Sequence, residues 1–139
     1  MGIARPHAMA GRVSPIAKLL WLAVIGALGT LARYQLGGLV QRLYGGTFPL
    51  GTLVVNALGC FLFGLVWTLA EERLVISGEM RAIILIGFMG AFTTFSTYAY
   101  ETSAMLRDAE WALAATNALT QNVLGVVAFF LGVALGRAL

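Results

Sequence analysis

The chain has 139 residues, of which 60% are hydrophobic and only 11% are charged, and its formal net charge at pH 7 is +3. A mean hydropathy of +0.88 lies far above that of a soluble domain, so the chain belongs in a lipid bilayer. Four apolar stretches use up most of its length, which excludes an additional soluble catalytic or receptor domain.

Residues 1–18 are predicted to form a basic N-terminal tail, and residues 19–139 a single four-helix transmembrane domain. The tail cations Arg5, Arg12 and Lys18 suit anionic lipid better than nucleic acid, so no nucleic-acid partner is expected. A signal peptide is the alternative interpretation of this segment. It is disfavoured because the following apolar run lacks a convincing small-residue cleavage site.

The first predicted span, from about Leu19 to about Tyr44, carries an arginine in an apolar setting. A central membrane arginine costs about 2.5–3.5 kcal/mol on insertion scales. Arg33 shares one narrow helical face with Gly26, Gly29 and Gly37. Such a face allows close helix packing, so Arg33 is predicted to face a protein interface or an aqueous vestibule. Pairing with a lipid phosphate is the alternative.

The second predicted span runs from about Thr52 to about Ala70 after a glycine- and proline-containing turn. Asn56 would leave an unsatisfied amide if it faced lipid, so it is predicted to point into the protein. It could serve an ion pathway or only form a structural hydrogen bond between helices. The sequence alone leaves both open.

The third predicted span, about Ala82 to about Leu106, contains the stretch GFMGAFTTFSTYAYE, Gly87–Glu101. Its glycines lower helix propensity, and its clustered hydroxyl groups compete with the helical backbone for hydrogen bonds. We therefore predict a break in mid-membrane, where freed carbonyls bind cations and new helix ends attract anions. Beyond the break, Phe95 and Tyr98 lie one turn apart and could face a ligand or pack in the core.

The fourth predicted span runs from about Trp111 to the C-terminus and carries a stripe of polar and small residues. The stripe is interpreted first as a packing surface, with its two amides as possible pathway lining. Its members are Asn117, Gln121, Gly125, Ala128, Gly132 and Gly136.

The distribution of Lys and Arg gives only a weak orientation signal. Six such residues fall on the side of the tail, second loop and C-terminus: Arg5, Arg12, Lys18, Arg73, Arg81 and Arg137. Arg42 and Arg107 fall on the other side. Without the two tail arginines the ratio is four to two, a bias that permits insertion in both orientations.

These motifs together resemble the fluoride channel family known as Fluc or CrcB. The resemblance covers GALGTLARY with Arg33, GTLVVNALGCFLFG with Asn56, the third-span stretch, and the glycine-spaced fourth span. It implies a multi-pass protein of the cell inner (plasma) membrane that mediates passive, fluoride-selective efflux. It also implies an antiparallel dual-topology homodimer with a structural sodium ion at its centre.

The resemblance also assigns residues. The sodium ion would bind backbone carbonyls of Gly90 and Thr93, and Arg33 would belong to the vestibule. The fluoride pathway would be lined by Asn56, Phe95, Tyr98, Ser96 and Thr97. Two departures from the family pattern are Ala91 in place of a glycine and Tyr98 in place of a phenylalanine. Gln121 and Asn122 stand where the family commonly has serines, and neither is assigned a role.

Three other classes of protein were weighed. A small dual-topology, proton-coupled drug or cation antiporter has the same size, but the first span here carries Arg33 and no acidic residue. A purely structural subunit would gain nothing from an interrupted helix. An enzyme is not expected, because the predicted spans contain no Ser/His pair or metal-ligand set.

Overall fold

A computed structural model describes residues 14–139, and four of its helical stretches are long and apolar enough to cross a membrane. This confirms the predicted all-α class and its four spans. The elements in chain order are α1 (Pro15–Tyr44), α2 (Leu50–Glu71), α3 (Gly78–Ala82), the π-helix η1 (Ile83–Met89), α4 (Gly90–Phe92), α5 (Phe95–Arg107) and α6 (Trp111–Ala138).

The first helix begins at Pro15 rather than near Leu19. The hydroxyl of Ser14 accepts a hydrogen bond from the Ala17 amide at 3.2 Å, and proline is favoured in a first helical turn. Lys18 therefore lies in α1, whereas the sequence analysis placed it in the tail. The rest of the predicted tail, residues 1–13, lies outside the described residues.

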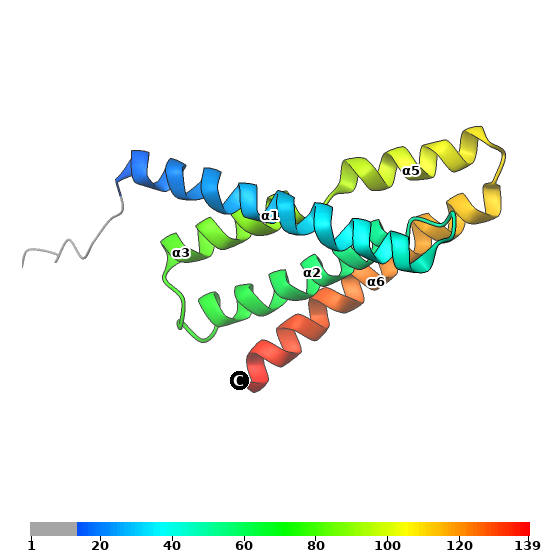
Figure 1. Ribbon diagram of the computed structural model, residues 1–139. Helices are drawn as coiled ribbons and strands as arrows, with labels where there is room; N and C mark the ends of the chain where they lie inside the picture. Colours follow the sequence, from blue (N-terminus) through cyan, green and yellow to red (C-terminus); the bar gives the residue numbers. More distant parts are fainter. Residues whose placement is uncertain (1–13) are drawn as a thin grey trace, which may run out of the picture.

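The helices α2 and α6 pack side by side over much of their length (Figure 1). A Cβ atom on Gly64 would overlap the carbonyl oxygen of Phe129, and one on Gly132 would overlap that of Phe61. Close approach of the two backbones therefore requires glycine at both positions. The predicted packing role of the small-residue stripe on α6 is confirmed, because Gly125, Gly132 and Gly136 are all buried.

The glycine face of α1 contacts two different elements. A Cβ on Gly29 would overlap the Phe88 carbonyl oxygen of η1, and a Cβ on Gly51 of α2 would overlap the Gly37 carbonyl oxygen of α1. Arg33 lies between these two contacts along α1. The glycines that flank it thus pack against protein, as the helical spacing predicted.

The third span is interrupted at Thr93 and Thr94, which confirms the predicted break. Both residues have extended backbones, with φ −81° and ψ 155° at Thr93 and φ −146° and ψ 105° at Thr94. The glycines before them do not unwind, because Gly87 belongs to η1 and Gly90 has a helical φ of −61°. The two hydroxyl residues, rather than the glycines, form the break.

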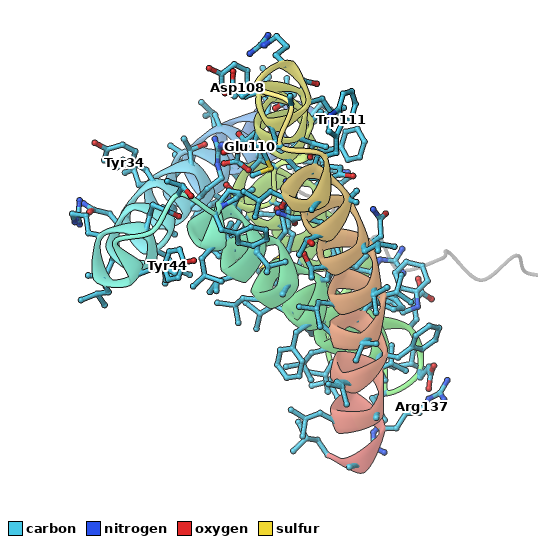
Figure 2. All side chains as sticks on the ribbon, turned by 90° about the vertical axis from the view of Figure 1, so that its right-hand side faces the viewer. Tyr34, Tyr44, Asp108, Glu110, Trp111 and Arg137 are labelled. Carbon is cyan, nitrogen blue, oxygen red and sulfur yellow. The ribbon has the colours of Figure 1, made fainter. Side chains whose placement is uncertain are left out.

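Beyond the break, α5 runs toward the start of α6 and reaches it at their shared turn (Figure 1). Figure 2 shows Asp108, Glu110 and Trp111 gathered around this turn, with Arg137 at the opposite end of α6. The α1–α2 turn lies at the same end as the α5–α6 turn, while the α2–α3 turn and the C-terminus lie at the other (Figure 1). The helix directions therefore alternate, and the charged turns lie at two opposite ends (Figure 1), as the Lys and Arg distribution was interpreted.

Ion pairs join the helix ends near the C-terminus. The guanidinium of Arg137 donates to both carboxylate oxygens of Glu72, at 2.7 and 2.8 Å, and this hydrogen bonding holds the pKa of Glu72 below its usual range. Arg81 pairs with Glu71, and its guanidinium lies 5.4 Å from the centre of the Trp67 ring. Exposed pairs of this kind contribute little individually.

Candidate functional site

The centre of the site is the broken backbone of the third span, which is held by the side chain of Asn56. The Asn56 Oδ1 accepts a hydrogen bond from the Thr94 amide at 2.8 Å, and its Nδ2 donates to the Thr94 carbonyl at 3.2 Å. The Nδ2 also donates to Oε1 of Gln121 on α6 at 3.1 Å. One amide thereby connects α2, α6 and both backbone groups of a residue in the break.

These bonds redirect the donors that a continuous helix would use. In an unbroken α-helix the Thr94 amide would donate to the Gly90 carbonyl, and the Thr97 amide to the Thr93 carbonyl. Here the Thr94 amide donates to Asn56, and the Thr97 amide donates to the Thr94 hydroxyl at 3.2 Å. The Gly90 and Thr93 carbonyls consequently lose their usual helical partners.

One cavity of about 430 Å³ lies on the α1 side of the break. Its wall includes Arg33, Thr52, Thr94, Thr97 and Glu101. The hydroxyl of Thr52 donates to the Glu101 carboxylate at 2.6 Å. The Arg33 Nε is buried and has no hydrogen-bond partner among the described residues. This arginine therefore borders the cavity that also carries the Thr52–Glu101 pair.

A second cavity of about 280 Å³ is lined by Asn56, Thr94, Phe95, Tyr98 and Gln121. The rings of Phe95 and Tyr98 meet edge to face, with centroids 5.3 Å apart and planes at 65°. Phe95 is 76% exposed in the single chain, although it is a large apolar residue near the middle of the fold. An amide pair and two aromatic rings thus converge beside the break.

Thr94 lines both cavities, so they meet at the break. The Thr94 hydroxyl donates to Oγ1 of Thr97 at 2.8 Å and lies 3.3 Å from Oγ of Ser96. Thr94 also caps the N-terminus of α5, which is why its hydroxyl points back into the turn. Threonine is among the residues favoured at an N-cap, and this preference could have identified Thr94 as the cap in the sequence.

The structure places four of the five predicted pathway residues in the walls of the two cavities that border the break. Asn56, Phe95 and Tyr98 share the second cavity, and Thr97 lies in the first together with Arg33. Ser96 is exposed and lines neither of these two cavities. The sequence reasoning missed Thr94 and the bond from Asn56 to Gln121, because partners 38 and 65 residues apart follow from the packing of different helices.

Comparison with known proteins gives a consistent match over most of the chain. Residues 20–133 match the family described as CrcB-like protein, Camphor Resistance (CrcB). The fluoride-specific ion channel FluC of Nitrosococcus oceani is 65% identical over 115 residues, which cover 83% of this chain and 92% of that protein.

Two further relatives carry the same name. The fluoride-specific ion channel FluC of Desulforapulum autotrophicum is 52% identical over 120 residues, and that of Solidesulfovibrio magneticus is 53% identical over 120 residues. In both comparisons the match covers 86% of this chain and 96% of the relative. The chain is therefore a multi-pass membrane protein that belongs to the CrcB family.

Proposed function

We propose that this chain is a fluoride-selective ion channel that lets fluoride leave the cell passively across its inner membrane. The observation that carries the proposal is the pair of cavities that meet at the break, one bordered by Arg33 and the other by Asn56, Phe95 and Tyr98. The names of the relatives, which are 52–65% identical, support it.

The chemistry of the second cavity suits a small, strongly hydrated anion. A selective path must replace the water around such an ion with close donors, because a bare charge in a low-dielectric region is very costly. In this cavity, amide groups and the electropositive edges of Phe95 and Tyr98 are such donors, and the hydroxyl of Thr97 lines the other cavity. In the single chain both protons on the Asn56 nitrogen already have acceptors, so fluoride contact at Asn56 would require one of these bonds to exchange.

The proposed channel is an antiparallel homodimer with one chain in each orientation. Phe95 is 76% exposed, and the backbone at Gly90 is also exposed. Both positions sit at mid-span, where a second copy of the chain would cover them. The weak Lys and Arg bias permits both orientations in the same membrane.

We further propose a structural sodium ion at the centre of the dimer. The Gly90 and Thr93 carbonyls fit this role, because the donors that would normally occupy them are bound to Asn56 and Thr94. Oxygen atoms are the preferred ligands of hard cations. Two carbonyls from each chain would supply four oxygens, and the ion would supply positive charge that ties the two broken helices together.

Efflux of fluoride from vesicles containing the purified protein tests the channel proposal. We expect rapid, passive fluoride release down its concentration gradient, with chloride release close to that of protein-free vesicles. A requirement for a proton gradient, or transport of an organic cation instead of fluoride, would favour the antiporter alternative.

Labelling of a single exposed cysteine tests the dual topology. In a Cys60→Ala background, Val75→Cys places a thiol in the α2–α3 turn, where Val75 is exposed. We expect a membrane-impermeant reagent to label about half of the protein from each side. Adding three lysines to the tail should fix one orientation and reduce transport. Labelling from one side only would contradict the dual topology.

Backbone changes at the break test the sodium site. Gly90→Pro should abolish transport, because proline distorts the backbone and removes a helical donor at a cost of about 3 kcal/mol or more. Thr93→Ser keeps the same carbonyl and a hydroxyl that bonds to Met89, so it should retain transport. Vesicle efflux measures both variants, and full transport by Gly90→Pro would refute the site.

A further inference from the structure

Gln121 is a buried amide that has one end fixed and the other end free. It is only 8% exposed, and it lies on α6 in the wall of the second cavity. Its Oε1 accepts the hydrogen bond from Asn56 at 3.1 Å. Its Nε2 is buried and has no partner among the described residues. A buried amide donor without an acceptor costs free energy comparable to a lost hydrogen bond, so this atom calls for an explanation.

The orientation of this amide follows from the backbone. The Thr94 amide can only donate, so the Asn56 atom that faces it is the oxygen Oδ1. The other Asn56 atom is therefore the nitrogen, which can only donate to Gln121. This requires the Gln121 oxygen to face Asn56 and leaves its two N–H donors free. The direction of the hydrogen bonds is thus fixed from Thr94 through Asn56 to Gln121.

We propose that Gln121 Nε2 is an anion-binding donor of this cavity and contacts fluoride as it passes Phe95 and Tyr98. The inference rests on the proposed function and adds a residue on α6 to the pathway. Gln121 fits the role better than Asn56, whose nitrogen already donates to two acceptors. Asn56 then acts as a positioning residue, which holds the break and presents the Gln121 donors to the anion.

Two substitutions separate a donor role from a purely structural one. Gln121→Met keeps the length of the side chain and removes its polar atoms without adding charge. Gln121→Glu keeps an oxygen toward Asn56 and replaces the free NH₂ group with a second oxygen. If Nε2 meets the anion, both variants should lose about ten- to a hundred-fold in fluoride flux at neutral pH. Gln121→Met also removes the oxygen that accepts from Asn56, so its thermal melting midpoint should fall below that of the parent, whereas Gln121→Glu keeps that acceptor.

The Glu variant should recover when the pH falls. Acidification protonates the introduced carboxyl group and so restores a neutral side chain with one O–H donor. None of the other residues that line this cavity carries a carboxylate, which assigns the recovery to position 121. Protein-free vesicles at each pH correct for leakage of hydrogen fluoride, and the parent protein corrects for any pH effect elsewhere.

Thr116→Val serves as the matched control on the same helix, because Thr116 is exposed and its hydroxyl bonds to the Ala112 carbonyl of its own helix. It should transport at the parent rate. Flux through Gln121→Met at the parent rate would overturn the inference, whatever the flux through Gln121→Glu. A reduced flux in Gln121→Met together with parent-rate flux in Gln121→Glu would also overturn it, in favour of a structural role. If the parent itself moves no fluoride, the proposed function fails instead.

Discussion

Asn56→Asp should abolish fluoride efflux from vesicles and lower the thermal stability of the purified protein. The native amide makes three hydrogen bonds, one accepted from the Thr94 amide and two donated to oxygens of Thr94 and Gln121. A carboxylate preserves only the first. It places its second oxygen against two acceptors and adds a negative charge beside the proposed anion path.

The size of this effect follows from the number of groups left without partners. Each buried polar group that loses its partner costs about 1–3 kcal/mol. Here the carbonyl oxygen of Thr94 and Oε1 of Gln121 both lose the donor that Asn56 supplies. Asn56→Ala loses all three bonds, including the one that a carboxylate keeps, but it places no charge against the two acceptors, so its flux should fall less than that of Asn56→Asp. Efflux rates and melting midpoints of the two variants measure the difference. Parent-rate transport by correctly folded Asn56→Asp would contradict the assignment.

Much of this region could be predicted from local sequence features. An asparagine in an apolar span must face protein, and Asn56 does. Glycine spacing on α1 and α6 predicted their packing faces, because helical periodicity places such residues on one side. Clustered threonines predicted a break, since their side chains compete with the backbone ladder, and the break occurs at Thr93 and Thr94.

The partners of these residues could not be predicted in the same way. Thr94 lies 38 residues from Asn56, and Gln121 lies 65 residues away, so their contacts depend on the relative register of three helices. Helix propensity also pointed to Gly87 and Gly90 as positions where the helix would unwind. Both stay helical, because η1 is stabilised by packing against α1. Tertiary contacts therefore decided which of the disfavoured positions unwound.

Phe95→Ile should lower fluoride flux about ten- to a hundred-fold if the ring contacts the anion at the rate-limiting step. Isoleucine keeps a large apolar side chain but removes the electropositive ring edge. Phe95 is 76% exposed in the single chain, so its replacement removes little packing within that chain. Isoleucine also keeps apolar contact with the second copy of the chain proposed to cover this position, so flux should fall while the melting midpoint of the dimer stays near that of the parent.

Tyr98→Phe should retain transport, because it keeps the aromatic ring and its contact with Phe95. The Tyr98 hydroxyl accepts one long hydrogen bond from Asn122, at 3.5 Å, so its removal costs little. This variant also restores the residue that the family pattern has at this position. A large loss of flux in Tyr98→Phe would instead assign the hydroxyl a direct role.

Phe130→Ile is the matched control for Phe95→Ile. Phe130 is also exposed, at 63%, and it also meets an aromatic neighbour edge to face, with its centroid 5.6 Å from that of Phe129. It does not line the cavity that contains Phe95. If ring edges act on the anion, only Phe95→Ile should lose flux. Equal flux through both variants and the parent would show that the Phe95 ring serves packing alone, because the same change in chemistry would then have no effect beside the cavity.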